Sequence, residues 1–330
     1  MTATSIRIGV VGAGAWGLAL AIAAARAGRD VRVCGRPGPA FADLRASRRS
    51  SRLPGVDLPA EIALVDDLAS LERCDALIVA TPAQTVRDAC ARIAASTGAP
   101  RPLIVCAKGI ERASGQFMSE VVAESAPGFA YAVLSGPSFA GDVARGLPTA
   151  VTLACEDAGL AAELADALQG PNFRLYDSDD PRGVEIGGAA KNVLAIACGA
   201  AAGLGLGASA SAALAARGFA ELARFGEAFG AKPATLMGLS GLGDLVLTCA
   251  SPQSRNFAFG FELGRGRTAA DAGEGKLAEG ALTAGALVKL ARARGVEMPI
   301  AEAVDAVIRG DVTSAKAVEI LLSRPRRREN

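Results

Sequence analysis

The stretch Ile6-Arg-Ile-Gly-Val-Val-Gly-Ala-Gly-Ala-Trp-Gly17 joins a short β-rich run to a cluster of glycines, and an Ala- and Leu-rich run follows it. This order predicts a buried strand, a tight turn and a helix. In that setting, Gly12 permits the turn, Gly14 lets the backbone approach a pyrophosphate, and Gly17 lets the helix pack on the strand. The phosphates would bind at the positive end of the helix. We therefore predict a dinucleotide site at these three glycines.

Short apolar runs alternate with helical patterns through the first half of the chain, which indicates a parallel sheet with crossover helices. The expected strands are 5–11, 31–34, 62–64, 76–80, 103–107, 130–134, 150–154 and 173–176. The expected helices include 15–27, 84–95, 114–124 and 158–169. We predict an α/β domain with a Rossmann-like, doubly wound sheet over residues 1–182. The polar stretch Asp177–Arg182 is the expected boundary, with Asp or Ser capping the helix that follows.

Residues 183–330 have a different pattern, because the β signals nearly vanish. Long Ala- and Leu-rich helical patterns are interrupted at 203–207, 232–233, 238–243, 251–252 and 264–266. We predict a second, all-α domain. Two uncharged runs, Ile8–Ala25 and Asn192–Ala216, resemble membrane segments, but the first contains four glycines and the second has few large apolar side chains. We expect both to be packed segments, without integral membrane contact.

The composition excludes several kinds of chemistry. The 330 residues contain no histidine, which removes Ser-His-Asp and Cys-His catalysis and HExxH zinc sites. Proton transfer must then fall to Lys, Asp, Glu, Tyr or Cys. The seven cysteines are dispersed without a CxxC pair, which is typical of reduced, buried thiols in a cytoplasmic protein and argues against a bound metal. The net charge of +1 gives no field that would draw the chain to nucleic acid.

The second predicted strand ends in Val33-Cys-Gly-Arg36, 19 residues after Gly17. An enzyme that selects NAD is expected to carry an acidic residue there, on the ribose 2′-hydroxyl. Asp30 precedes the strand and so lies at its wrong end. Arg36 could instead pair with a 2′-phosphate. We predict that NADP(H) is favoured and that NAD(H) is the second cofactor; the alternative is that Arg36 is an ordinary surface arginine.

Lys191 is the leading candidate for acid–base chemistry. It shares one stripe of a predicted helix with small or apolar residues: Val184, Gly187, Ala195 and Cys198. A lysine on such a face either extends along it to water or sits in a cleft where burial lowers its pKa. Because histidine is absent, we predict that Lys191 donates and accepts the proton.

Two further candidates follow predicted strands. Lys108 closes a strand, so its ammonium is expected at the carboxyl edge of the sheet, where ligands bind in such folds. The segment Leu134–Ala140 has the same placement, and its backbone amides and the Ser138 hydroxyl could hold a polar ligand. A surface lysine and a simple Gly-Pro turn are the alternatives.

The second domain adds polar residues in two predicted loops. Asp244 lies in the glycine-rich segment Leu239–Leu245, where it could stabilise an ammonium or cap a helix. The adjacent residues Ser254, Arg255 and Asn256 suit a phosphate and vicinal hydroxyls. As a lone tripeptide, they could equally form an ordinary polar loop.

Together these segments resemble the bacterial NAD(P)-dependent glycerol-3-phosphate dehydrogenases. The similar motifs stand in family order and cover nearly the whole chain: Gly12–Gly17, Cys106–Glu111, Leu134–Ala140, Gly187–Ala197, Gly241–Cys249, Ser251–Asn256 and Ala278–Gly280. The resemblance implies reversible hydride transfer between NAD(P)H and C2 of dihydroxyacetone phosphate. The product, sn-glycerol 3-phosphate, would supply glycerophospholipid synthesis in the cytoplasm.

The resemblance also implies roles for individual residues, with Lys191 as the general acid–base. It implies substrate contacts by Lys108, Gly136, Ser138, Lys191, Asp244, Ser254, Arg255 and Asn256. It implies that the cofactor is lined by Gly12, Gly14, Trp16, Gly17, Arg36, Lys108, Ala140, Arg255 and Glu279. These roles agree with the interpretation from the residues and add the identity of the substrate.

Two stretches depart from the family pattern. After Gly203–Gly207 the family usually has an Asp-Asn-like polar pair and a lysine, whereas this chain has Ala208-Ser-Ala-Ser211. After Asn256 the chain reads Phe-Ala-Phe, where the family is often more basic. The first departure affects local contacts and the second affects contacts to the cofactor phosphates. Neither stretch contains a residue assigned to proton or hydride transfer.

Two other functions are compatible with parts of the sequence. A β-hydroxyacid-type dehydrogenase has a similar two-domain plan and helix lysine, but it tends to place Asn four residues after that lysine, where this chain has Ala195. A non-catalytic NADP(H)-sensing module would leave Lys191 and Asp244 without a role. The glycine-interrupted helices and small-residue faces make a homodimer possible.

Overall fold

The structure, a computed structural model, describes residues 6–273 and 278–325. The chain divides into two compact units. The first contains Gln116–Glu185 and the chain up to Lys108, and the second contains Gly109–Gly115 and the chain from Ile186 onward. The sequence prediction placed the boundary between 182 and 183, whereas the structure divides the chain after Glu185, inside a helix. It also groups 109–115 with the second unit, which no local pattern indicated.

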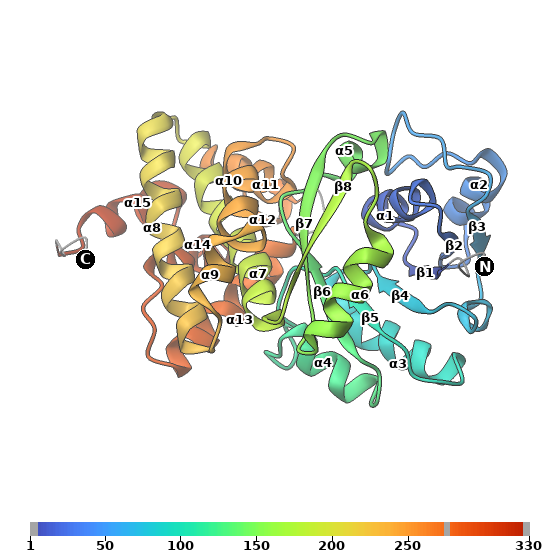
Figure 1. Cartoon of the computed structure of the whole chain (residues 1–330). Coiled ribbons are helices and arrows are strands. Elements are labelled where there is room, and N and C mark those ends of the chain that lie inside the picture. Colours follow the sequence, from blue (N-terminus) through green and yellow to red (C-terminus); the bar gives the residue numbers. More distant parts are fainter. Residues whose placement is uncertain (1–5, 274–277, 326–330) are drawn as a thin grey trace. The chain divides into compact units, whose positions relative to one another are not determined.

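An eight-stranded sheet runs through the first unit, in the order β3-β2-β1-β4-β5-β6-β7-β8 (Figure 1). The strands are β1 (Arg7–Val11), β2 (Asp30–Cys34), β3 (Ala63–Val65), β4 (Ala76–Val79), β5 (Leu103–Val105), β6 (Tyr131–Ser135), β7 (Thr149–Ala154) and β8 (Phe173–Ser178). The first six are parallel, β7 is antiparallel to β6, and β8 is parallel to β7. The predicted doubly wound sheet is confirmed; the reversal at β7 was not predicted.

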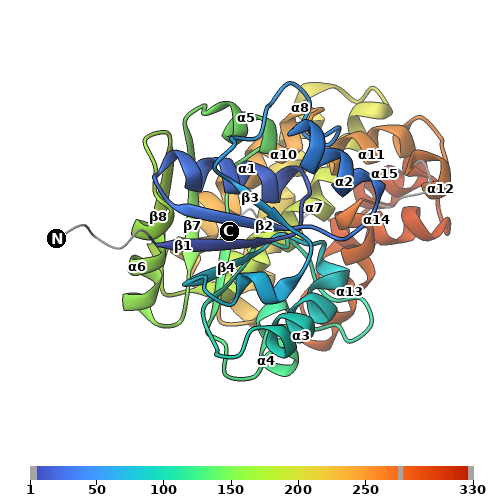
Figure 2. The ribbon, with the colours of Figure 1, turned by 90° about the vertical axis from the view of Figure 1, so that its right-hand side faces the viewer.

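Helices cover both faces of this sheet (Figure 2). One face carries α1 (Ala15–Arg26), α2 (Pro39–Ser47), α5 (Ala140–Arg145) and α6 (Ala158–Leu168). The other carries η1 (Leu68–Leu71), η2 (Ala83–Thr85), α3 (Val86–Ser96) and α4 (Met118–Ser125). Alternate strand residues enter the two cores, as Val10 and Val11 do. The strands are therefore apolar on both sides, which a sheet buried on both faces requires.

The second unit is helical (Figure 1), as predicted. Its elements are α7 (Pro181–Gly203), α8 (Gly207–Ala228), α9 (Pro233–Met237), η3 (Leu239–Gly243), α10 (Asp244–Ala250), α11 (Arg255–Gly264), α12 (Ala269–Ala272), α13 (Glu279–Ala293), α14 (Pro299–Arg309) and α15 (Ser314–Leu322). Helix α7 begins in the first unit, where Asp180 Oδ1 accepts the N–H of Gly183 at 2.8 Å. The predicted cap of this helix is thus confirmed.

Within the second unit, α7 and α11 meet backbone to backbone. A methyl group at Gly199 would collide with the carbonyl oxygen of Phe257, and one at Gly260 would collide with that of Ile196. One turn further along, Gly203 and Gly264 are restricted in the same way. The scarcity of large side chains after Asn192 therefore reflects close helix packing. It leaves little room for α7 to shift.

Two helical stretches, 181–203 and 233–250, are long and apolar enough to cross a membrane by length and composition alone. Most of the first is buried inside the structure, as expected of a core helix. The uncharged run Ile8–Ala25 is divided between β1, a turn and α1, as its glycines predicted.

Candidate functional site

The glycine turn after β1 has the geometry of a phosphate-binding loop. Gly12 has φ +116°, and a Cβ there would lie 2.8 Å from the carbonyl oxygen of Ala80. A Cβ at Gly17 would collide with the carbonyl oxygen of Gly12, so only glycine lets α1 approach the turn this closely. At Gly14, by contrast, a Cβ would meet no atom within 4 Å. The backbone is therefore open at the position that must approach a ligand.

The start of α1 fits an anion. Gly14 is the residue before the helix, and it has no side chain to cap the first amides. These amides and the positive end of a 12-residue helix suit a pyrophosphate. The turn also lies where the strand order reverses, because β1 pairs with both β2 and β4. Ligands of doubly wound sheets bind at such a switch point. The residues present therefore fit a dinucleotide cofactor.

Two other predicted cofactor residues lie on the same side of the sheet. Trp16, in the first turn of α1, and Ala140, the first residue of α5, are both half-buried and pack against one hydrophobic core. Helices α1 and α5 are neighbours in the first unit. The structure thus brings Trp16 and Ala140 to the face that also carries the glycine turn.

Arg36 lies just beyond the carboxyl end of β2 and is exposed. Asp30 is at the opposite end of that strand, where it pairs with Arg7 at 3.6 Å. No motif in the sequence singled out Asp66 and Asp67. Their charges, together with the larger effect of burial, help raise the pKa of the Cys34 thiol to about 11. Asp67 caps η1, and Asp66 accepts a hydrogen bond from Arg45 at 2.8 Å. Both carboxylates therefore already have partners.

The predicted residues after β5 and β6 converge on one carbonyl group. Lys108 Nζ donates to the carbonyl oxygen of Gly136 at 3.1 Å, and Ser138 Oγ donates to the same oxygen at 3.1 Å. Gly136 has φ +148°, and a Cβ there would lie 2.9 Å from Cα of Val151. The glycine therefore lets the chain turn tightly against β7, and it fixes the carbonyl that holds the half-buried Lys108 ammonium.

In the second unit, Lys191 is buried rather than extended to water. Its Nζ donates to Asp244 Oδ1 at 2.9 Å and to Thr248 Oγ1 at 2.7 Å. The exposed fractions of Lys191, Asp244 and Thr248 are 5%, 1% and 3%. A buried ammonium is tolerated only when paired and hydrogen-bonded, and these two groups supply the pairing. The arrangement holds a proton donor at a fixed place on α7.

The segment before Asp244 differs from its prediction. We expected a loop over Leu239–Leu245, but Leu239–Gly243 forms a π-helical turn that leads directly into α10. Gly241 allows this turn to press against the carbonyl of Leu236, and Gly187 on α7 leaves space for the carbonyl of Ser240. Asp244 is consequently the first residue of α10 and faces Lys191 from a rigid element. Such π turns are frequent at functional sites.

The remaining predicted residues lie near the amino ends of α11 and α13. Ser254 is buried and caps α11 by accepting the N–H of Phe257 at 3.2 Å. Arg255, the first residue of α11, is exposed. Glu279 is half-buried in the first turn of α13. Ser254, which precedes α11, and Glu279, the first residue of α13, thus lie at the starts of two helices of the unit that carries Lys191.

Asn256 joins α11 to two other helices. Its Nδ2 donates to Asn192 Oδ1 at 2.9 Å, and its Oδ1 accepts the N–H of Gly280 at 2.9 Å. Asn192 directly follows Lys191, and Gly280 directly follows Glu279. The structure therefore links Asn256 to the neighbours of both residues. The amide of Asn256 makes internal contacts that the sequence did not predict.

Thr248 and Asn192 are the residues that the sequence analysis missed. Thr248 is four residues after Asp244 on α10, so both side chains occupy one helix face, and its Oγ1 lies 3.3 Å from Asp244 Oδ1. This four-residue spacing would have pointed to Thr248 if a helix had been predicted from Asp244 onward. Asn192 carried no comparable signal, because its partner is 64 residues away.

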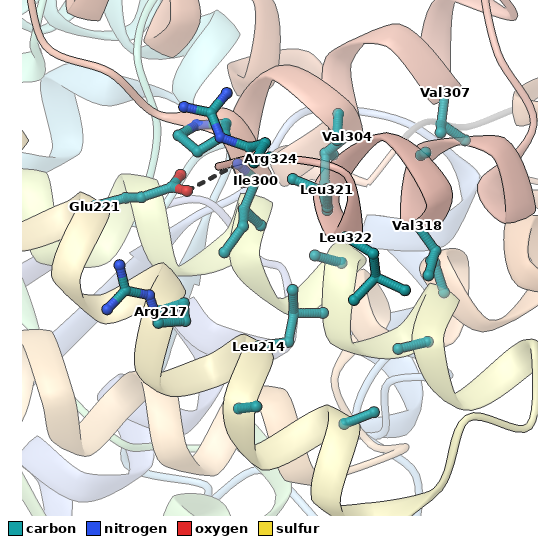
Figure 3. Close-up of a pocket in the computed structure, with 18 of the residues that line it drawn as sticks. Leu214, Arg217, Glu221, Ile300, Val304, Val307, Val318, Leu321, Leu322 and Arg324 are labelled. Carbon is teal, nitrogen blue, oxygen red and sulfur yellow. Dashed lines mark hydrogen bonds between the residues drawn. The ribbon is translucent and has the colours of Figure 1, made fainter. Parts of the chain in front are cut away.

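A separate groove of about 720 Å³ lies between α8, α14 and α15 (Figure 3). Its charged residues, including Arg217 and Glu221, gather toward one end, and apolar side chains such as Val318 and Leu322 line the other. Glu221 is buried and accepts the N–H groups of Ile300 and Ala301 at 2.8 and 3.3 Å. None of the predicted site residues lines this groove.

Comparison with known proteins identifies matches to both halves of the chain. The family models "NAD-dependent glycerol-3-phosphate dehydrogenase N-terminus" and "C-terminus" match residues 7–161 and 180–319. Glycerol-3-phosphate dehydrogenase [NAD(P)+] of Bradyrhizobium sp. strain BTAi1 is 58% identical over 318 residues, 96% of this chain and 97% of that one. The protein of the same name from Azorhizobium caulinodans is 58% identical and covers 98% of each chain.

A solved structure is similar over nearly the same length. The glycerol-3-phosphate dehydrogenase of Coxiella burnetii superposes with a TM-score of 0.92 at 37% identity, over 97% of this chain and 99% of that one.

Proposed function

Because this chain belongs to the NAD-dependent glycerol-3-phosphate dehydrogenase family, we propose that it catalyses the reversible, NAD(P)H-dependent reduction of dihydroxyacetone phosphate to sn-glycerol 3-phosphate. The observation that carries the proposal is the buried ammonium of Lys191, held by Asp244 and Thr248. In a chain without histidine, this is the group best placed to exchange a proton with an alcohol oxygen.

A nicotinamide cofactor held at the turn of Gly12, Gly14 and Gly17 would supply the hydride for C2 of the ketone in the reductive direction. Lys191 Nζ donates a proton to the alkoxide oxygen that develops at C2, and in the reverse direction it takes that proton back. Asp244 and Thr248 accept hydrogen bonds from the ammonium, so its direction is fixed before the reaction begins. The Lys108 ammonium adds positive charge for the phosphate or the oxyanion, and Gly136 orients it.

The cofactor preference follows from the end of β2. Arg36 is exposed there and suits the 2′-phosphate of NADP(H), whereas Asp66 and Asp67 are engaged elsewhere. The sequence provides no acidic residue at the position where a ribose 2′-hydroxyl would be bound. NADP(H) is therefore the favoured cofactor and NAD(H) the second.

The composition of the chain supports a proposal about its cellular location and its partners. We propose a cytoplasmic enzyme that uses small-molecule substrates, supplies glycerophospholipid synthesis and makes no integral membrane contact. The net charge of +1 and seven free, buried cysteines support this location. A homodimer is the proposed assembly, and light scattering during gel filtration would measure it.

The decisive experiment follows NADPH consumption with dihydroxyacetone phosphate in the wild type and in Lys191→Met. We expect kcat to fall by about 10²–10⁴-fold, because a positioned acid–base contributes about that much, while NADPH binding persists. Lys289→Met, which alters an exposed lysine of the same unit, is the matched control and should keep normal activity.

Three outcomes would contradict the proposed role of Lys191 or favour a different function. Near-normal kcat in Lys191→Met with NADPH still bound would remove the lysine from the mechanism. Turnover of small keto or semialdehyde acids in place of dihydroxyacetone phosphate would favour a β-hydroxyacid-type dehydrogenase. Cofactor binding without turnover of any of these substrates would favour an NADP(H)-sensing module.

A further inference from the structure

A buried carboxylate that the proposed reaction does not use holds the start of α7. Glu185 is 6% exposed and lies in the second turn of that helix. Its Oε1 accepts the N–H of Ser119 at 2.7 Å and the hydroxyl of Tyr131 at 2.8 Å, and its Oε2 accepts the Ser119 hydroxyl at 2.9 Å. Arg182 places a cation 3.7 Å from Oε2. The carboxylate thus ties α7 to α4 and to β6.

The preceding residue seats the helix on the same sheet. Val184 is fully buried and forms one apolar cluster with Val133 of β6 and Ala154 of β7. Because Val184 and Glu185 are consecutive, their side chains leave the helix about 100° apart. Two contacts in different directions fix both the rotation of the helix and its position along its axis.

Helix α7 connects this anchor to the proton donor. Within residues 6–273 and 278–325, it is the only helix or strand with residues in both units. Lys191 follows Glu185 by six residues, about 9 Å along the axis, and it lies on the same helix face as Val184. Further along, Gly199 and Gly203 hold α7 against α11. Lys191 therefore lies between two fixed points of one helix.

We propose that Glu185 is a positioning residue, which fixes the rotation of α7 and so the direction in which Lys191 Nζ presents its proton. A buried carboxylate must keep its hydrogen bonds, because losing them leaves a charge without partners in an apolar setting. A turn of α7 that draws Glu185 away from Ser119 and Tyr131 is therefore resisted more strongly than apolar contacts alone would resist it. The inference rests on the proposed function, since the direction of Lys191 matters only if Lys191 transfers the proton.

A graded set of variants tests the anchor. Glu185→Gln keeps the shape of the side chain, and its amide oxygen still accepts from Ser119 and Tyr131. Glu185→Asp keeps the charge but withdraws it by one methylene, and Glu185→Ala removes the anchor. Tyr131→Phe is the mildest change, because it removes one donor and leaves the other two. The matched control is Leu164→Ala, which removes a buried side chain of α6 in the same unit and should lower stability alone.

Two measurements separate positioning from a merely structural role. The stoichiometry of NADPH binding counts the folded protein. The single-turnover rate constant for NADPH oxidation, with enzyme in excess over NADPH and dihydroxyacetone phosphate saturating, excludes product release. This rate constant should fall about 100-fold in Glu185→Asp and Glu185→Ala, the cost of misplacing a reacting group by about 1 Å, and less in Tyr131→Phe. It should stay near normal in Glu185→Gln and Leu164→Ala, and the Kd for NADPH should be unchanged throughout.

Hydrogen–deuterium exchange provides a readout that needs no reaction. Amides of residues 183–189 should exchange faster in Glu185→Ala than in the wild type, whereas those of α11 should not change. Normal rate constants in Glu185→Asp and Glu185→Ala, or an equal loss in Leu164→Ala, would overturn the positioning role. So would an equal loss in Glu185→Gln and Glu185→Ala, because it would show that the charge matters and the anchor does not. A wild type that did not turn over the substrate would refute the proposed function and the positioning role with it, while faster exchange would still demonstrate the anchor.

Discussion

Lys191 shows how a charged side chain is kept inside a helix face made of small, apolar residues. The sequence left two possibilities for this lysine, extension to water or residence in a cleft. The ion pair with Asp244 at 2.9 Å and the contact with Thr248 favour the second, because the ammonium is satisfied without reaching solvent. Its partner Asp244 was predicted as a candidate, whereas Thr248 was not. A partner 57 residues away leaves no local periodicity.

Arg36 provides a prediction at the same scale. Arg36→Asp should lower kcat/KM with NADPH and raise kcat/KM with NADH relative to that with NADPH, because the carboxylate repels a 2′-phosphate and accepts a hydrogen bond from a 2′-hydroxyl. Loss of one charge-assisted contact corresponds to about 1.5–3 kcal/mol, or roughly 10–100-fold in kcat/KM for NADPH. Steady-state kinetics with both cofactors would measure the change. Unchanged selectivity would show that Arg36 is an ordinary surface residue.

At the scale of elements, strands were easier to predict than their directions. Each predicted strand exists within a few residues of its expected ends, because apolar runs between turns identify buried strands directly. The antiparallel direction of β7 depends on how α5 returns the chain, and no residue in β7 itself encodes it. The helices α2 and α5 were missed for a related reason: both are short and half-exposed, so they show little hydrophobic periodicity.

The α7–α11 contact leads to a prediction about stability. Gly199→Ala should destabilise the protein by about 1–3 kcal/mol, because the added methyl group collides with the carbonyl of Phe257 and overpacking costs that much. Gly141→Ala is the control, since a Cβ on that helical residue meets nothing within 4 Å. It should be neutral or stabilising by up to about 1 kcal/mol. Urea unfolding would measure the stabilities of both variants. Equal stabilities would contradict the close contact between α7 and α11.

Glu221 connects α8 to the start of α14 and makes stability depend on pH. Burial raises its pKa to about 7, although the N–H groups of Ile300 and Ala301 oppose this rise, as do the charges of Arg224 and Arg324. Between pH 4.5 and 7, the folded state therefore holds a proton here that the unfolded chain has lost. The contribution of Glu221 to stability falls as pH rises through this range and is constant below it. By pH 8 the fall is complete, at about 3 kcal/mol.

Glu221→Gln tests this dependence, because the amide oxygen can still accept from α14 but cannot ionise. The free energy of unfolding of the variant minus that of the wild type should be larger at pH 8 than at pH 4.5, by about 3 kcal/mol, because only the wild type loses stability over this range. Urea titrations at the two pH values would measure it. A constant difference between the two proteins would mean that Glu221 ionises normally in the folded state.

At the scale of the whole molecule, the chain passes between the two units three times, after Lys108, Gly115 and Glu185. The first two passages were not predictable, because 109–115 has no composition that separates it from its neighbours. Such connectivity couples the units, and we expect a single unfolding transition. Fluorescence of Trp16, the only tryptophan, reports on the first unit, and far-UV circular dichroism reports on the helices.

The two signals should change at the same urea concentration, with and without NADPH. At 100 times its dissociation constant, the cofactor should add about 2.7 kcal/mol to both transitions, because it binds only the folded state. Separate midpoints, or a cofactor effect seen by tryptophan alone, would show that the units unfold independently.

The crossing of α7 and α11 also restricts how this enzyme can be re-engineered. At Gly199 and Gly203, where two main chains touch, there is no room for a side chain, so these positions offer a designer almost no freedom. Altered substrate preference would have to come from the side chains around the lysine, on α10 and the ends of α11 and α13. A library that randomised α7 would mostly sample chains that cannot fold.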